Sequence, residues 1–515
     1  MFLRPPIINV GLKAVDNWEL GGITNYFVFK IRGPLDLDKL RSACRKLLEH
    51  HTILRTVFVP HKDKLFHVVM KRVPPEFDVN ERESSKEVQS AVIDRDMERS
   101  VNFGDPIIQF LLVDQGREGH KLLMRISHSL YDGISLPIIV RDLKAAYCGH
   151  EFSISSPYYQ FVSAFQTSQI LEAESFWRLH LEGAAMNRIV DHKGPSCRNS
   201  INRSLKRILV APETRKTGIT FASLVKTAWS LVLAEFASTT DVTFGQITTG
   251  RSAPTQGIDE IVGPCMNLVP VRVKLDSAAT FSELLRHVQD QHLDMLPHEN
   301  LGLHHIIEKC TSWPKWTRFS SILQHTNFNV DMNSLDMWGD VEMRLGNFTP
   351  DHDVSDVWIW TGPVGDNSYV DFTYSSNTLP VNMADEIFDL LCENINKLSD
   401  SPDTVLDSPL TRIQARLSLP LPEKISPPSD ALSPSPELLA VVRTTWSNYQ
   451  GELYHYHRHQ KYWTDNTPFF SLRGDLLAAA QISRDFEKQG FRVSPEEVID
   501  NPTVFSQATL LSLRI

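Results

Sequence analysis

The sequence predicts a multidomain protein of the mixed α/β (α+β) class. Short segments rich in β-branched and aromatic residues alternate with amphipathic helical segments through most of the chain, as in mixed folds. The chain has 515 residues, and at about 150 residues per domain this length corresponds to about two to four domains. A stretch rich in Pro and Ser separates a final helical segment from the rest. We therefore expect a large mixed region followed by a small helical domain.

The first predicted region, residues 1–155, contains several strands and two helices. Residues 26–31 (YFVFKI) favour a strand because they are β-branched or aromatic. Residues 35–38 (LDLD) supply a cap for the amphipathic helix at 39–50, whose apolar side chains recur at helical spacing. Further strands are predicted at residues 53–59, 65–70, 107–113 and 121–127, and a second helix at 136–147.

The second predicted region, residues 156–416, has the same mixture. Helices are predicted at residues 157–181, 221–237, 280–295 and 382–398, and strands at 242–248, 267–273, 322–328, 358–360 and 369–374. Residues 417–436 are crowded with Pro and Ser, so we expect an extended linker there. Residues 437–515 have a mostly helical pattern that is long enough for a small bundle.

Composition excludes several classes of protein. Lys plus Arg number 52 against 62 Asp plus Glu, a net charge of −10, which argues against nucleic-acid binding through a basic face. No apolar run approaches the ~20 residues of a membrane span, and the prolines near the start argue against a secretory signal. The six Cys include no CxxC pair, so we expect reduced thiols and no metal site. The sequence thus predicts a cytoplasmic protein without nucleic-acid or membrane partners.

Residues 124–135 (MRISHSLYDGIS) hold the most informative pattern. His128 follows an apolar strand, where a neutral imidazole can accept a proton at physiological pH. Asp132 is placed to pair with a cation and hold the loop. Gly133 allows a backbone conformation or a close approach that a side chain would block. Taken alone, this pattern is more typical of a hydrogen-bonded loop histidine than of a catalytic one.

Read as a whole, residues 127–133 (SHSLYDG) resemble the HHxxxDG active-site motif of condensation domains of nonribosomal peptide synthetases. Ser127 stands where the general motif has its first His, as in the SHxxxDG form of the fungal terminal, cyclising type. His128 matches the second His, to which the family's catalysis is credited.

Three more segments resemble motifs of the same family, in the same order. Residues 50–58 (HHTILRTVF) are similar to RHxxLRTxF, and Phe176-Trp177 with Leu181 to YWxxxL. Residues 263–272, which include Asn267 and Arg272, resemble GxxxNxxPxR. The family's opening helix and first motif are not visible before residue 26, so the N-terminal edge is either atypical or truncated.

The resemblance implies two lobes like those of chloramphenicol acetyltransferase, arranged in a V around a tunnel. His128 would lie in the tunnel and act either as a general base or as a positioning group. Asp132 would be structural, with Arg272 as its ion-pair partner. Substrates would be aminoacyl or peptidyl thioesters on phosphopantetheine arms of partner holo-carrier domains.

Residues 469–481 (FFSLRGDLLAAAQ) resemble the FFxLGGDSLxAxQ core of a peptidyl carrier domain. In that motif the Ser after Gly-Asp receives the phosphopantetheine arm, and Leu476 occupies this position here. Arg473 also replaces a Gly. Since Leu has no hydroxyl, the resemblance implies a carrier-like domain without a covalently bound arm.

Three functions remain open at this stage. The first is an amide-forming acyltransferase of nonribosomal peptide synthesis, with cyclising release as one form. The second is a non-catalytic docking remnant of a synthetase, and the third a standalone acyltransferase that uses coenzyme A thioesters.

Overall fold

The computed structural model describes most of the chain. The described residues are 24–61, 64–73, 77–80, 92–93, 95–96, 104–114, 119–164, 167–187, 189, 202–210, 218–237, 239–252, 256–313, 319–326, 335–348, 355–376, 378–401, 403–405, 434–453, 465, 476–494, 497–498, 501 and 503–514. The expected family features before residue 26, nearly all of the linker at 417–436, and Arg473 lie outside these residues.

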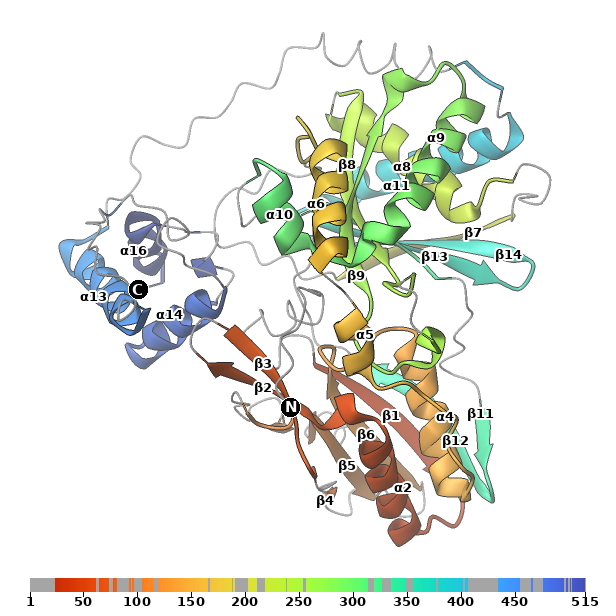
Figure 1. The fold of residues 1–515 in the computed structure, drawn as a ribbon, viewed down its shortest axis with the longest axis vertical. Coiled ribbons are helices and arrows are strands. Elements are labelled where there is room, and N and C mark those ends of the chain that lie inside the picture. Colours follow the sequence, from red (N-terminus) through yellow and green to blue (C-terminus); the bar gives the residue numbers. More distant parts are fainter. Residues whose placement is uncertain are drawn as a thin grey trace.

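A six-stranded sheet, in the order β11-β12-β1-β6-β5-β4, forms the lower lobe in Figure 1. Its strands are β1 (Thr24–Arg32), β4 (Phe77–Asn80), β5 (Ile108–Asp114), β6 (His120–Ser127), β11 (Leu335–Trp338) and β12 (Val341–Phe348). Helices α2 (Leu37–His50) and α4 (Ser135–Cys148) pack on one face. Asp36 caps α2 by accepting a hydrogen bond from the Lys39 amide, and Gly149 ends α4 in the left-handed conformation.

Two strands of this first sheet come from far along the chain. β12 pairs antiparallel with β1, from Tyr26 opposite Phe348 to Arg32 opposite Glu342. A division of the lobes at residue 156 therefore leaves residues 335–348 out of the sheet that they complete. By pairing with β1, β12 covers an edge that would otherwise expose unpaired backbone N–H and C=O groups.

A second six-stranded sheet, in the order β7-β14-β13-β10-β8-β9, forms the upper lobe in Figure 1. Its strands are β7 (Arg203–Val210), β8 (Asp241–Thr248), β9 (Asn267–Lys274), β10 (Ser321–His325), β13 (Val357–Val364) and β14 (Asn367–Tyr374). Helices α8 (Phe221–Ala237), α9 (Phe281–Met295) and α11 (Val381–Asp400) share one core with this sheet. Helices α6 (Thr167–His180) and α10 (Leu303–Cys310), with the 3-10 helix η5 (Leu296–Leu301), build a second cluster around Trp177.

The observed elements differ from the predicted ones in a few places. The helix expected at 157–181 is described as two, α5 (Tyr158–Ala164) and α6. Residues 52–55 form a 3-10 helix, η1, before a separate hairpin of β2 (Thr56–His61) and β3 (Lys64–Val69). β4, β7, β11, β12 and α10 had no counterpart in the sequence prediction.

The C-terminal helices form a small domain of their own, shown in blue in Figure 1. They are α13 (Pro436–Leu453), α14 (Leu476–Lys488) and α16 (Val504–Ser512). Trp446 is buried among apolar side chains of all three, and its indole N–H donates to Gln507 over 2.8 Å. The predicted helical bundle therefore has a real apolar core.

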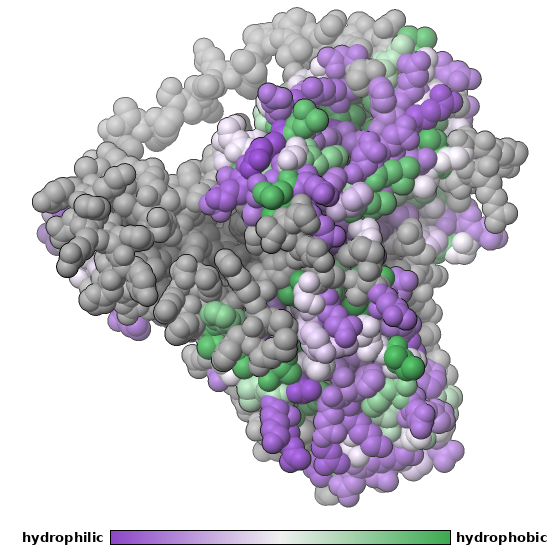
Figure 2. Space-filling view, in the orientation of Figure 1, coloured by the Kyte–Doolittle hydropathy of each residue, from purple (hydrophilic) through white to green (hydrophobic). Residues whose placement is uncertain are grey.

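The described surface agrees with this organisation. Figure 2 shows hydrophilic side chains over most of the described surface of both lobes in this view, with scattered apolar residues among them. No helix among the described residues is both long enough and apolar enough to span a bilayer.

Candidate active site

The predicted catalytic segment is the connection between β6 and α4. β6 ends at Ser127, and the backbone turns there because the Leu130 amide donates to the Ser127 carbonyl over 3.0 Å. Ser127 is buried, and its hydroxyl donates to the Ser129 hydroxyl at 3.1 Å. Ser127 thus supports the turn, which presents His128 directly after the strand.

His128 lies half-buried against an aromatic ring. Its imidazole stacks on the Tyr131 phenol with ring centroids 4.6 Å apart and planes 22° apart. Tyr131 is 3% exposed and makes an edge contact with Phe27 of the β1 strand. The structure therefore places the predicted catalytic imidazole at a strand end, on a fixed aromatic surface.

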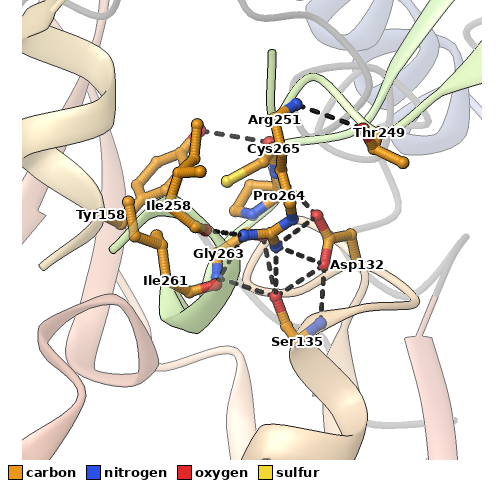
Figure 3. Close-up of polar contacts among 10 residues, drawn as sticks. All are labelled: Asp132, Ser135, Tyr158, Thr249, Arg251, Ile258, Ile261, Gly263, Pro264 and Cys265. Atoms are coloured by element: carbon orange, nitrogen blue, oxygen red, sulfur yellow. Dashed lines mark hydrogen bonds and ion pairs between the residues drawn. The ribbon is translucent and has the colours of Figure 1, made fainter. Parts of the chain in front are cut away.

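Asp132 is the centre of a buried polar network that joins the two lobes (Figure 3). Its two carboxylate oxygens accept hydrogen bonds from Nη2 of Arg251 at 3.0 and 2.9 Å. They also accept from the Ser135 amide at 2.8 Å and from the Cys265 amide at 3.1 Å. The Ser135 hydroxyl adds a bond of 2.7 Å to the same carboxylate. This charge is therefore satisfied from both lobes, as a buried carboxylate requires.

Both Nη atoms of Arg251 are paired as well, while its buried Nε has no hydrogen-bond partner among the described residues. Its Nη1 donates to the carbonyls of Ile258 and Ile261 at 2.6 and 3.1 Å, and its side chain is 3% exposed. Figure 3 shows these carbonyls and Asp132 on different sides of the guanidinium. The planar fork of arginine suits this arrangement because it donates in several fixed directions.

The predicted pairing of Asp132 with Arg272 is wrong. Arg272 donates instead to Asp241 at 2.9 and 2.6 Å, and to the carbonyls of His180 and Glu182. The reason is its place in the sheet, since Arg272 lies five residues into β9 from Asn267. At about 3.3 Å per residue, this is about 17 Å from the strand end that approaches Asp132.

The role expected for Gly133 is not what the structure shows. A Cβ built on Gly133 meets no atom within 4 Å, and its φ is not in the left-handed region. Near Asp132, the crowded glycines are Gly250 and Gly263 of the opposite lobe. A Cβ on Gly263 would lie 2.2 Å from the Tyr158 ring, and one on Gly250 (φ 66°) would lie 1.8 Å from the Cys265 carbonyl oxygen. Close backbone approach therefore occurs beside Arg251.

Asn267 begins β9 and is fully buried. Its side-chain amide donates to the Glu299 carbonyl over 2.8 Å, and its side-chain oxygen accepts from the Leu268 amide. These bonds fix η5 against the start of β9. Asn267 thus supports the loop of residues 263–266, which carries the Cys265 amide to Asp132.

Residues 50–58 contact α4, the helix that follows the His128 segment. The His51 ring nitrogen Nε2 lies 2.8 Å from Asp142 of α4, whose other oxygen accepts from Arg141 at 2.9 Å. Burial opposes ionisation of Asp142, but these two partners together hold its pKa below the usual range. His50, His51 and Asp142 have the side-chain types of a metal site, with ligand atoms within 4.8 Å of one another. Because Arg141 already neutralises the carboxylate, we interpret the group as structural.

Cys265 lies at the lobe junction but does not have the character of a nucleophile. Burial raises the pKa of its thiol well above the usual range, and Asp132 adds to the rise while Arg251 opposes it. The thiol therefore stays protonated, and a protonated thiol is a poor nucleophile. Among the described side chains at this junction, His128 remains the best candidate for proton chemistry.

Sequence reasoning missed Arg251 and Ser135. A signal for Arg251 existed, because Thr249-Gly250-Arg251 follows a strongly β-type segment and places a cation just past a strand end. Which strand end meets the other lobe depends on sheet order, and no local pattern gives that order. Ser135 has the Asp-x-x-Ser spacing of a hydrogen-bonded turn.

Comparison with known proteins identifies the class. A family model for "Condensation domain" matches residues 24–414, and one for "Phosphopantetheine attachment site" matches residues 463–511. The chain is 39% identical over 322 residues to nonribosomal peptide synthetase apmB of Penicillium brevicompactum, covering 62% of this chain and 14% of that protein. It is 32% identical over 390 residues to nonribosomal peptide synthetase 4 of Gibberella zeae, covering 75% of this chain and 5% of that protein.

Solved structures show the same fold. A crystal structure described as "CT mutant" is 29% identical and has a TM-score of 0.67, covering 78% of this chain and 91% of its own. The X-domain from teicoplanin biosynthesis is 18% identical with a TM-score of 0.64, covering 78% of this chain and 97% of its own, and shows the fold alone.

The chain belongs to the condensation-domain family, the amide-bond-forming acyltransferases of nonribosomal peptide synthesis, because the family model matches more than half of it. More particularly, it is a condensation domain followed by a carrier-type domain. The family expected from the four sequence motifs is confirmed. The chain spans only 14% and 5% of the length of the two relatives named above.

Proposed function

We propose that this chain forms an amide bond between an amine and a carrier-bound acyl thioester, with His128 at the reacting atoms. The observation that carries the proposal is the position of His128, directly after β6 and four residues before Asp132, which Arg251 of the other lobe holds. Residues 128–132 thus carry both the imidazole and the carboxylate that joins the two lobes.

In the proposed reaction the amine nitrogen attacks the thioester carbonyl carbon. The carbon–sulfur bond breaks, the thiol of the phosphopantetheine arm leaves, and the proton lost by the amine balances the thiolate. His128 either accepts this proton or holds the amine in line for attack. Asp132 and Arg251 contribute by fixing the segment, and Ser127 and Asn267 support it from each side.

Turnover of a loaded carrier tests this proposal. The protein is incubated with a holo-carrier bearing a peptidyl thioester and an amine acceptor, and product is measured by mass spectrometry. His128→Ala should lower the rate by about 10²–10⁴-fold, the range for loss of a positioned acid or base. His150→Ala is the matched control, because His150 is exposed beyond the end of α4. Equal rates for wild type and His128→Ala would show that His128 has no catalytic part.

The finer proposal is cyclising release, supported by Ser127 in the first motif position. A substrate whose own amine attacks its thioester leaves as a ring. The ring is lighter by one water than the acid formed by hydrolysis, so mass spectrometry separates the two. Release of the linear acid alone would exclude cyclisation.

We further propose that residues 417–436 link the condensation lobes to a carrier-like domain at 437–515 that does not carry its own arm. Leu476, the first residue of α14, stands where the carrier motif has its acceptor Ser. The arms would then come from partner holo-carriers in the cytoplasm.

Treatment with a broad-specificity phosphopantetheinyl transferase and coenzyme A should leave the mass of the wild-type chain unchanged. Leu476→Ser should gain one arm. The gain of an arm by the wild-type chain at any residue of 437–515 would overturn this part of the proposal.

A further inference from the structure

We propose that Tyr131 is a positioning residue for the His128 imidazole and that Asn25 holds Tyr131 in place. This inference rests on the proposed function, since it concerns the group assigned to the reaction. Tyr131 follows His128 by three residues, and Asn25 lies on strand β1.

The stacking contact is the first support. The centroids of the His128 and Tyr131 rings are 4.6 Å apart, and the 22° angle between their planes makes the contact nearly parallel. A histidine has a broad preference about its second side-chain torsion, so the backbone alone does not fix the plane of the imidazole. A ring stacked on one face restricts that rotation.

Tyr131 is suited to this task because it is itself fixed. It is 3% exposed, and its ring meets Phe27 edge-on with centroids 5.6 Å apart. Burial raises the pKa of its hydroxyl well above the usual range, an effect that Asn25 opposes and Asp132 reinforces. The phenol therefore stays neutral and keeps its hydrogen-bonding proton.

Asn25 supplies the anchor. Its side-chain amide donates to the Tyr131 hydroxyl, and the residue is 7% exposed. On β1 it lies opposite Ile126 of β6, two residues before His128, so Asn25 is on the strand next to the one that His128 follows. The amide oxygen of Asn25 is buried and has no described hydrogen-bond partner, so Tyr131 is the described partner that fixes this side chain.

The consequence for the reaction is geometric. A general base must lie within hydrogen-bond reach of the proton that it takes. A displacement of about 1 Å can cost about 10²-fold in rate. Tyr131 would therefore raise the rate without contacting the substrate.

The kinetic test compares Tyr131 with Tyr147, which is also 3% exposed, in the same lobe core, with a described ring contact to Trp338. Tyr131→Leu should lower kcat by about 10²-fold while KM stays within about 2-fold. Tyr131→Phe keeps the stacked ring but loses the hydroxyl that Asn25 holds, so its kcat should lie between those of the wild type and Tyr131→Leu. Tyr147→Leu and Tyr147→Phe should retain the wild-type kcat per folded molecule, with folding measured by thermal denaturation.

A second measurement does not depend on turnover. The His128 ring Cε1–H resonance, assigned with His128→Gln, should be shifted upfield in the wild type by the stacked ring. The shift should persist in Tyr131→Phe and disappear in Tyr131→Leu.

The possible results separate the two proposals. An unchanged kcat in folded Tyr131→Leu overturns the positioning role, whether or not the resonance moves. A resonance that Tyr131→Leu leaves unmoved also overturns it. Absence of turnover in the wild type contradicts the proposed function instead, while the resonance still reports on the contact.

Discussion

Arg251 and Arg272 are both buried arginines of the same lobe, and each donates to an aspartate and to two backbone carbonyls. Their partners differ in origin. Asp241 belongs to the strand next to that of Arg272, whereas Asp132 belongs to the other lobe. Their exposure differs too, because the Asp132 side chain is 2% exposed and that of Asp241 is 35% exposed. One pair joins the lobes, and the other only ties a strand pair to α6.

Both are Arg–Asp ion pairs, but only the Asp132–Arg251 pair joins the two lobes. The side-chain chemistry of the two arginines is the same, and it is the position of Arg251 past the end of β8, together with the strand order, that brings it to the active-site segment. The cost of breaking a pair depends on burial, since a partner left behind in the interior cannot be solvated. The comparison therefore predicts unequal effects for matched substitutions.

The largest expected difference is between Asp132→Ala and Asp241→Ala. Asp132→Ala leaves Arg251 buried without its carboxylate, and should lower the free energy of unfolding by about 3–5 kcal/mol. Asp241→Ala should cost less, about 1–2 kcal/mol, because water can reach the position of its 35% exposed carboxylate and the 7% exposed Arg272 side chain keeps its two carbonyls. Denaturant unfolding of both variants measures this, and equal losses would show that joining the lobes adds nothing to the value of the pair.

A smaller effect is expected at the glycines beside each end of the cross-lobe pair. Gly250→Ala should cost at least about 2 kcal/mol, because φ is 66° and the Cβ would collide with the Cys265 carbonyl. Gly133→Ala has open space and should leave stability unchanged or slightly higher. Thermal denaturation of the two variants gives the comparison. A Gly133→Ala loss as large as that of Gly250→Ala would contradict the described backbone.

The smallest effect, taken per pH unit, concerns His180 beside the Arg272–Asp241 pair. Burial, together with the nearby charge of Arg272, lowers the pKa of His180 to about 4. The folded pKa lies below the ordinary value of 6.5, so the unfolded chain takes up a proton first as pH falls. Stability should therefore be full above pH 6.5 and decline towards pH 4, by at most about 1.4 kcal/mol per pH unit.

His180→Gln should flatten this decline when the free energy of unfolding is measured across that range. His150→Gln, at an exposed position, is the control and should leave the slope as in the wild type. A slope that His180→Gln does not change would assign the acid sensitivity to other groups.

Much of the fold could be predicted from sequence, because local periodicity carries it. The helix at 221–237 is predicted to the residue, and β9 ends one residue beyond its prediction. β12 was missed because its local pattern does not indicate its partner, which is β1 more than three hundred residues earlier. The position of His128 after a strand could be predicted as well, but the bond from Asn25 to Tyr131 could not, because it joins a strand to a loop 106 residues later.

The strands β11 and β12 also bear on how the molecule can be divided. Residues 335–348 are reached only after the chain has built most of the second lobe, yet they complete the first sheet beside β1. A gene fragment that stops near residue 155 would therefore encode a sheet with an open edge at β1, which invites association with other chains. Expression fragments, and exchanges of modules between synthetases, should treat residues 24–414 as one inseparable unit.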